Sequence, residues 1–498
     1  MISIGGVIGT GLFLGTATAL KNAGPVGALL AYTFIGSICF CVMVSVGEMI
    51  SLLPVAGGHI RLAARFVDPS FSFALGWTLW YGWSVLLNIK LIAELSAAAT
   101  LIDYWQPGVN NAVWVTVCLV VAVGINMFGV GIYGESEFIF CSIKVITIVG
   151  LIILGIVLDL GGGPDHDRLG FRYWISPGPF VQYNGISGTT GRVVGWVSAT
   201  IQAAFSFCGT EVVAITAAEV KNPHRNLPRA IRRVYARILV FYIGSVFIIG
   251  LLVPSNDPLL NLDSGNASAS PFVIAINRAG IRGLPSVINA AFLTSAWSAA
   301  SGDLYFASRA LYGMAAAGNA PRLFLRTTRS GLPIASVAFC ALFTLLAYMT
   351  TSASAGEVFT WFANMTATCG LWGWCAIGIM YVRYHAGFKA QMLDKCALPY
   401  WSRLQPFAAW WVIFACGITM IFSGFEVFLH GQWSTATFIT NYLPIALFPI
   451  LYSLSKLATR IPLVSPQDMD FVTGSHIEED PTDLAPENRM QEFWAWLI

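Results

Sequence analysis

Charged residues are scarce in this chain. Of its 498 residues, 10% are Asp, Glu, Lys or Arg, whereas 56% are hydrophobic. A typical soluble domain carries about 25% charged residues, and a single globular core has no room to bury so much apolar surface. The composition therefore excludes an ordinary soluble protein and favours a membrane protein.

Several sequence signatures are also missing. There is no nucleophile elbow, no zinc-binding spacing and no cluster of intramembrane histidines, so we expect neither an enzyme nor a bound metal or cofactor. The basic residues lie in short loops without a groove-binding motif, which argues against nucleic acid. Nine of the ten cysteines lie in apolar runs and Cys396 lies in a basic loop, so we predict small buried residues and no disulfide framework. No basic residue precedes the first apolar run, and we expect no cleavable signal peptide.

Long apolar runs are abundant. A run of about 20 apolar residues spans the hydrocarbon core of a bilayer as a helix. The sequence predicts an all-α membrane protein with about twelve transmembrane helices: 2–20, 26–53, 71–101, 112–132, 138–158, 196–219, 238–255, 285–309, 333–352, 356–384, 407–429 and 436–456. We divide the chain into a membrane domain, residues 1–456, and a polar, acidic C-terminal tail, residues 457–498, that we expect to be largely disordered.

The distribution of basic residues predicts the orientation. Lys and Arg gather in the loops after helices 2, 6, 8 and 10, most densely in residues 221–237, and such loops face the cytoplasm. Both termini are then cytoplasmic. Asn266-Ala-Ser268 is a glycosylation acceptor that this topology places outside, which agrees but is weak support.

Helix 1 contains an unusual glycine cluster. Residues 5–11 read GGVIGTG, and each glycine costs about 1 kcal/mol relative to alanine in a helix interior. In lipid, an unwound backbone is tolerated where it lines a cavity, and its free N–H groups can hold an anion. A nucleotide-binding loop is excluded because no strand precedes the segment. Close helix packing through glycine remains an alternative.

Helix 6 has a comparable interruption. Residues 205–211 read FSFCGTE, with a glycine beside polar groups in mid-membrane. Helix 1 opens the first five spans and helix 6 opens the next five. Interrupted helices at matching positions in two halves indicate the binding site of an inverted-repeat transporter.

Few ionisable residues lie inside the predicted spans, and each needs a partner, a cavity or a neutral state. Glu211 follows the helix 6 break, where it is a candidate for proton coupling or gating, against a structural hydrogen bond. Lys144 in helix 5 is a candidate to replace a sodium ion. For Glu48, Glu94 and Asp303 we favour contacts at helix ends. The remaining members of this set are Lys90, Glu219 and Glu426.

These motifs resemble those of a known family. Residues 1–15 and 205–211 resemble the helix 1 and helix 6 signatures of fungal amino acid permeases, of the amino acid–polyamine–organocation superfamily. Further matches cover nearly the whole chain: residues 65–69 (RFVDP), 143–145 (IKV), 218–219 with 222–230 (NPHRNLPRA), 270–272 (SPF), and 307–309 with 311–313.

The resemblance implies a fold and a function. The fold is a leucine-transporter-type core of a 5+5 inverted repeat with two additional C-terminal helices. The function is import of an L-amino acid across the plasma membrane by symport, with the proton as the coupling ion. The lipid bilayer surrounds the protein, and no other cofactor is implied. Residues 9–11 would hold the α-carboxylate, and carbonyl groups near Val7, Phe205 and Cys208 the α-ammonium. The implied substrate-binding residues are Val7, Ile8, Gly9, Thr10, Gly11, Phe205, Ser206, Cys208 and Gly209, with Glu211 and Lys144 for coupling or gating.

The chain departs from the family pattern at three places. It begins at the helix 1 signature, without the usual N-terminal tail. Helix 3 has about one extra turn and carries Lys90, and residues 300–303 (ASGD) replace a Gly-Asn-Ser-Asp string. Two alternatives stay open: an amino-acid sensor that does not transport, and a transporter of a polyamine, choline or 4-aminobutyrate. The sequence does not specify which amino acid is carried, nor the oligomeric state.

Overall fold

The computed structural model describes most of the chain: residues 9–13, 15–55, 57–82, 102, 105, 110–128, 130–215, 220, 222–260, 270–329, 331–345, 348, 355–395, 398–429, 431 and 433–475. Within these ranges the regular structure consists of α-helices and short 3-10 helices, without a strand. The all-α prediction is confirmed for this part of the chain.

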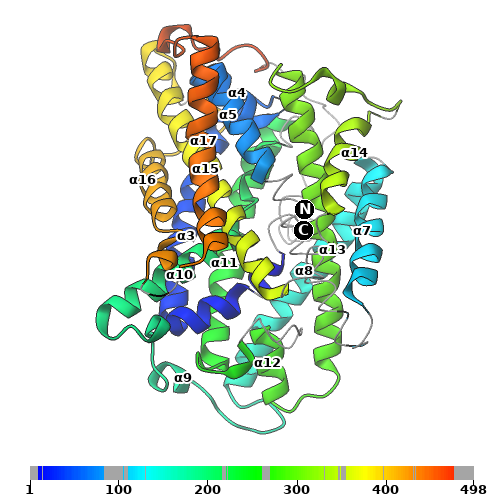
Figure 1. Ribbon diagram of the computed structural model, residues 1–498, viewed down its shortest axis with the longest axis vertical. Helices are drawn as coiled ribbons and strands as arrows, with labels where there is room; N and C mark the ends of the chain where they lie inside the picture. Colours follow the sequence, from blue (N-terminus) through cyan, green and yellow to red (C-terminus); the bar gives the residue numbers. More distant parts are fainter. Residues whose placement is uncertain are drawn as a thin grey trace.

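The helices form an elongated bundle along the long axis of Figure 1. Their bounds are α2 (Thr10–Phe13), α3 (Gly15–Leu52), α4 (Gly58–Phe66), α5 (Pro69–Trp80), α7 (Asn111–Met127), α8 (Val130–Asp159), α9 (Arg172–Ile175), α10 (Gly188–Phe207), α11 (Pro223–Leu252), α12 (Pro271–Arg278), α13 (Leu284–Ala316), α14 (Ile334–Phe343), α15 (Ala355–Ala390), α16 (Phe407–Ile421) and α17 (Thr435–Thr459). Short 3-10 helices follow some of them, including η2 (Tyr183–Gly185), η3 (Thr210–Ala214) and η11 (Phe425–Phe428).

Many of these helices suit a bilayer. Among the described residues, five segments are long and apolar enough to cross a membrane: Gly11–Leu52, Gly131–Asp159, Gly188–Val212, Ala363–Ala390 and Thr435–Thr459. Four shorter apolar helices accompany them. The molecule is therefore a multi-pass membrane protein, because several lipid-length helices run along one bundle axis.

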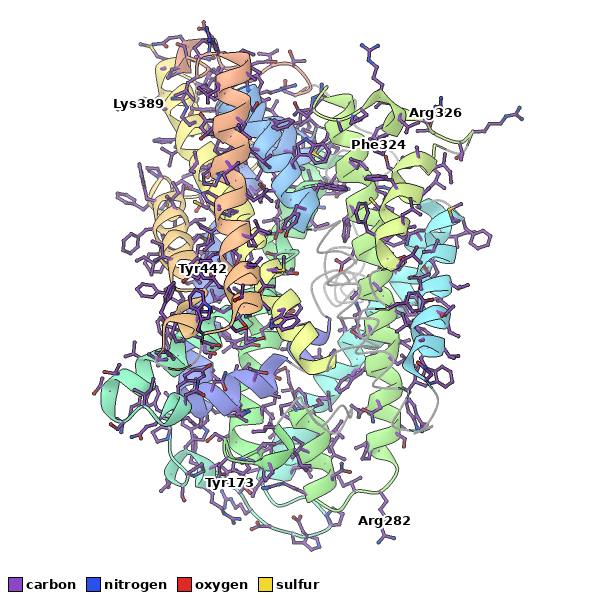
Figure 2. All side chains as sticks on the ribbon, viewed as in Figure 1. Tyr173, Arg282, Phe324, Arg326, Lys389 and Tyr442 are labelled. Carbon is purple, nitrogen blue, oxygen red and sulfur yellow. The ribbon has the colours of Figure 1, made fainter. Side chains whose placement is uncertain are left out.

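Loops from alternate predicted spans gather at opposite ends of the bundle. In Figure 2, Arg326 and Lys389, which follow predicted helices 8 and 10, lie at the end that also carries α4. Tyr173 and Arg282, which follow predicted helices 5 and 7, lie at the other end, together with α9 and α12. We call these the α4 end and the α12 end. The alternation is what a chain crossing the bundle repeatedly produces.

Helix α3 lies in the interior and packs along α10, α11 and α16. Its Tyr32 ring lies 6.1 Å from that of Phe207, and the Phe207 ring lies 4.5 Å from that of Tyr242 on α11. All three side chains are fully buried. Interior aromatic packing of this kind fixes α10, whose C-terminal end carries the helix 6 break.

Several predicted boundaries are wrong. Predicted helices 1 and 2 run together in α3, where the non-helical residue that separates them is Gly24, with φ of 77°. A Cβ at Gly24 would lie 2.8 Å from the Pro179 carbonyl oxygen, so the turn requires glycine. α8 begins at Val130 instead of 138, and α11 begins at Pro223 instead of 238. Hydropathy detects the apolar part of a helix, whereas backbone hydrogen bonds extend helices beyond lipid.

The segment after α17 is packed against the α4 end. The Val464 N–H donates to the Val67 carbonyl at 2.9 Å, and the Gln391 amide donates to the Met469 carbonyl at 2.8 Å. The buried Phe471 ring lies 4.9–5.6 Å from the rings of Phe66, Tyr384 and Phe388. The expected disorder is therefore wrong for residues 460–475, because aromatic burial offsets the ordering entropy. Residues 476–498 lie outside the described part.

Candidate functional site

The helix 1 break is visible from Gly9 onward. Gly9 is buried, and its carbonyl accepts from the Leu12 N–H at 3.3 Å, which begins the short helix α2. A Cβ at Gly11 would lie 3.0 Å from the Cα atom of Ser206 and 3.2 Å from the ring of Phe205. Glycine at position 11 thus lets α2 lie directly against α10. Val7 and Ile8, predicted to bind substrate, lie outside the described residues.

The helix 6 break lies where the sequence predicts it. Helix α10 ends at Phe207, and Cys208 leaves the helical region with ψ of 136°. Gly209 follows in the left-handed region, with φ of 103°, and a 3-10 turn begins at Thr210. Helix α10 therefore ends at Phe207, inside the predicted span 196–219. A last helical turn that stops inside the protein leaves carbonyl groups without intrahelical partners.

One side chain joins the two breaks. The Ser206 hydroxyl donates to the Gly11 carbonyl at 2.8 Å and lies 3.0 Å from the hydroxyl of Tyr32 on α3. The Ser206 carbonyl in turn accepts from the Tyr242 hydroxyl of α11 at 2.8 Å. We call this contact between Gly11 and Ser206 the junction. It places the predicted binding segments side by side, although 195 positions separate them.

Glu211 connects the helix 6 break to α15. Its side chain is fully buried, and its Oε2 accepts from the Trp374 indole N–H at 2.8 Å and from the Gly209 N–H at 3.2 Å. Cys39 of α3 donates to the neighbouring Thr210 hydroxyl at 3.4 Å. Both donors contact the same oxygen, so the buried Glu211 carboxyl group is hydrogen-bonded within the protein.

Lys144 is fully buried on α8 and belongs to a polar cluster between α8 and α13. Glu137, also on α8, accepts from the Ser298 hydroxyl with both carboxylate oxygens, at 2.9 and 3.0 Å. Lys144 and Asp303 act electrostatically on Glu137. The cluster joins α8 to α13 through Ser298, whereas the hydrogen bond from Trp374 joins Glu211 to α15.

Sequence reasoning missed Glu137. The predicted helix 5 begins at residue 138, which left this carboxylate in a loop, whereas α8 begins at Val130. A usable signal was the spacing: Glu137 and Lys144 are seven residues apart, or two helical turns, and share a face. Nearby, the Asn126 amide of α7 donates to the Ser301 carbonyl at 3.0 Å, so three helices meet here.

Of the other charged residues predicted to make helix-end contacts, the structure describes Glu48 and Asp303. Glu48, near the end of α3, accepts from the Ser402 N–H at 2.6 Å and from the Tyr381 hydroxyl, in keeping with helix-end contacts. Asp303 is buried near the middle of α13, which continues to Ala316, so the expected helix-end contact is wrong for this residue. Lys90, Glu94 and Glu219 lie outside the described residues.

Comparisons with known proteins decide the family. The profile of the amino acid permease family matches residues 1–464. A proline-specific permease of Emericella nidulans is 41% identical over 510 residues, which cover 100% of this chain and 92% of that protein. The chain belongs to the amino acid permease family. This permease also matches a dicarboxylic amino acid permease (39% identical; 99% of this chain and 81% of the relative) and a lysine-specific permease (36%; 99% and 80%) of Saccharomyces cerevisiae.

The comparison of folds agrees. The permease superposes on a manganese transporter mutant of Eremococcus coleocola with a TM-score of 0.61 and 12% identity, over 92% of this chain and 93% of that chain. At that identity the likeness concerns the fold alone. The family membership, carried by full-length matches near 40% identity, makes this protein an amino acid transporter and confirms the resemblance.

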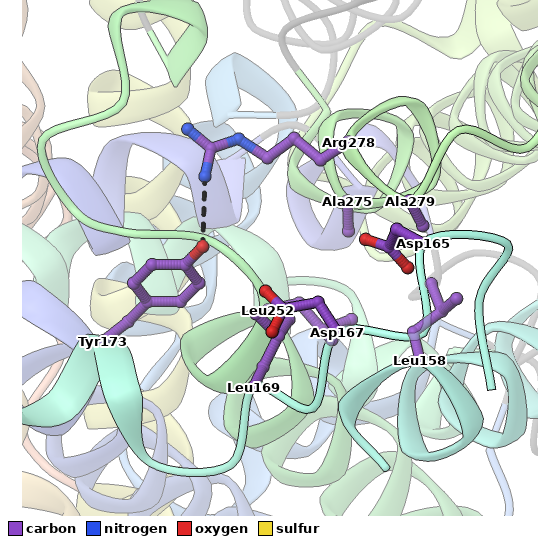
Figure 3. Close-up of a pocket in the computed structure, with 9 residues that line it drawn as sticks. All are labelled: Leu158, Asp165, Asp167, Leu169, Tyr173, Leu252, Ala275, Arg278 and Ala279. Atoms are coloured by element: carbon purple, nitrogen blue, oxygen red, sulfur yellow. Dashed lines mark hydrogen bonds between the residues drawn. The ribbon is translucent and has the colours of Figure 1, made fainter. Parts of the chain in front are cut away.

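A small polar cavity at the α12 end belongs to the loops. It has a volume of about 160 Å³ and is drawn in Figure 3. Arg278 lines it, forming an ion pair with Asp257 at 2.7 Å and a hydrogen bond to the Tyr173 hydroxyl at 3.3 Å. Asp167 pairs with both Arg172 guanidinium nitrogens at 2.7 Å, and this lowers the pKa of Asp167 and raises that of Arg172. These contacts link α9 to α12, so the polar residues around the cavity have a structural role.

Proposed function

We propose that this permease imports an L-amino acid with a proton across the fungal plasma membrane. The observation that carries the proposal is the junction, where two interrupted segments from opposite halves of the chain meet through the 2.8 Å bond from Ser206 to Gly11. Interrupted helices that meet in mid-bundle are the usual location of a transporter's substrate site. We further propose twelve spans, a 5+5 repeat with two additional helices, and cytoplasmic termini with residues 457–498 as the tail.

The orientation rests on charge. Arg326 and Lys389 lie at the α4 end in Figure 2, and basic loops favour the cytoplasmic side. The α4 end is then cytoplasmic, and the α12 end faces outward. Fewer basic residues belong to the loops of the α12 end.

The substrate's two charged groups match the two breaks. The N–H groups of residues 9–11, at the start of α2, suit an α-carboxylate. The carbonyl groups at the end of α10, around Phe205 and Cys208, suit an α-ammonium, because a helix C-terminus carries partial negative charge. Ser206 and Gly209 shape this end. The carbonyls of Gly11, Ser206 and Phe205 each accept a hydrogen bond within the protein, and a carbonyl oxygen can accept a second one.

Coupling is proposed for Glu211 and Lys144. Glu211 adjoins the helix 6 break and its bond to Trp374 reaches α15, so a change in its proton occupancy alters a contact between two helices. Lys144 supplies a fixed positive charge in the interior of α8. No metal is required by this scheme.

The test is uptake into proteoliposomes. Purified permease is assayed with labelled L-proline, L-aspartate and L-lysine, with and without an inward proton gradient, and the remaining amino acids compete. Concentrative uptake of at least one amino acid that needs the gradient is expected. Binding without uptake would instead indicate a sensor, and uptake of choline, a polyamine or 4-aminobutyrate in place of all amino acids would change the ligand.

A further inference from the structure

A second cavity lies beside the junction, toward the α12 end. Its volume is about 260 Å³, and its walls come from the first part of α3, from α10, from η2 and from the segment that follows α16. Pockets for drug-sized ligands begin at about 300 Å³, so this space suits a smaller solute. Gln202, one helical turn before Ser206 on α10, forms part of its lining. The cavity therefore adjoins the proposed substrate site without being the same site.

The carboxylate of Glu426 lines this cavity. Glu426 of η11 accepts from the Ser198 hydroxyl at 3.1 Å, and Ser198 accepts from the Asn22 amide at 3.0 Å. Tyr183 hydrogen-bonds to the same carboxylate, and its burial, followed by the charge of Glu426, raises the pKa of Tyr183 above its usual value. Among the described residues no Lys, Arg or His forms an ion pair with Glu426. The carboxylate is thus positioned by neutral groups, and its charge is left for a cation.

Gln202 connects this cavity to the junction. It is 5% exposed, and it lines the cavity. Gln202 also contacts the junction, because its carbonyl lies 3.0 Å from the Ser206 hydroxyl.

We propose that this cavity is an outer amino acid site, in which the α-ammonium of the substrate binds the Glu426 carboxylate. Lys21 lines the same cavity and is exposed, which places a cation where it attracts the α-carboxylate. The ligand class is a zwitterion with a primary or secondary ammonium group. This inference rests on the proposed function and adds a step to it: the substrate docks at Glu426 and then moves along one turn of α10 to the junction.

Equilibrium binding to the purified, full-length permease tests the outer site. Tritiated L-proline, L-aspartate and L-lysine serve as probes, and saturation curves are compared for the native protein, Glu426→Gln and Gly11→Ala. The native protein is expected to show two components. Glu426→Gln weakens one of them by about tenfold or more, because a charge-assisted hydrogen bond is lost, and leaves the other within twofold. Gly11→Ala, which disturbs the junction, has the opposite effect.

Controls separate folding from binding. Glu135→Gln removes an exposed carboxylate of α8 that does not line the cavity, and both components should persist. Glu426→Asp should restore part of the lost component. Size-exclusion elution and thermal unfolding verify each variant, and uptake by Glu426→Gln should show a raised KM with little change in kcat.

The outcomes distinguish this proposal from the proposed function. A single component in the native protein, or two components that Glu426→Gln leaves unchanged, overturns the outer site while amino acid transport stands. Native protein that binds none of the common amino acids overturns both.

Discussion

Gly11→Ala tests the contact on which the proposed substrate site depends. The added methyl group would lie 3.0 Å from the Cα atom of Ser206 and 3.2 Å from two atoms of the Phe205 ring. A backbone atom cannot swing aside as the end of a side chain can, so α2 and α10 must separate. The separation also lengthens the 2.8 Å bond from Ser206 to the Gly11 carbonyl.

The size of the effect follows from three terms. Overpacking in a tight interior costs about 1–3 kcal/mol, and a weakened neutral hydrogen bond costs about 0.5–1.5 kcal/mol. Alanine in place of a helical glycine stabilises the helix by up to about 1 kcal/mol, which offsets part of this loss. The three terms leave a net loss of about 0.5–4.5 kcal/mol. The middle value of about 2.5 kcal/mol predicts a fall of roughly sixtyfold in kcat/KM for uptake, since about 1.4 kcal/mol is tenfold.

The assay compares initial uptake rates in proteoliposomes with matched protein content. Gly124→Ala, in α7, is the control, because a Cβ at that position meets no atom within 4 Å. This control should transport normally and unfold at the same or a slightly higher temperature. If Gly11→Ala transports with native kcat and KM, the reasoning that α2 must touch α10 for substrate binding is refuted.

The remaining predictions concern coupling and the C-terminal segment. Glu211→Gln should exchange substrate across the membrane but fail to concentrate it, and pH-dependent accumulation at the native level would contradict a coupling role. Lys144→Ala should lose proton-driven uptake, and normal uptake would show that its charge is dispensable. Phe471→Ala removes a buried aromatic side chain, a change that costs about 3–5 kcal/mol at fully buried positions, so limited proteolysis of the segment after α17 should accelerate several-fold. The Val472 side chain is 68% exposed, so Val472→Ala should leave the proteolysis rate unchanged. Backbone hydrogen bonds from Thr473 and Val472 lower the pKa of Asp470. The ionised Asp470 carboxylate therefore stabilises the packing of the segment after α17 at neutral pH. That contribution should disappear as pH falls below about 3.9, and the same proteolysis assay at a series of pH values measures the loss.

Much of the site was predictable because the signal is local. A glycine cluster in lipid is costly wherever it occurs, so residues 5–11 and 205–211 identify interrupted helices without any knowledge of packing. The structure places the second break at Cys208 and Gly209, inside the predicted segment. Glu137 was not predicted as a buried residue because its burial depends on where α8 begins. Polar helix ends carry little hydropathy signal, so the sequence did not locate that boundary.

The sequence by itself determined that this permease is an all-helical membrane protein with interrupted segments, and it identified the family. Composition and runs of apolar residues are properties of neighbouring positions, and the bilayer turns them directly into helices. The tertiary structure alone decided which polar groups meet. The bonds from Ser206 to Gly11 and from Ser198 to Glu426 join residues 195 and 228 positions apart. Such contacts depend on how helices pack in three dimensions, because the residues around each partner do not specify which distant segment it will meet.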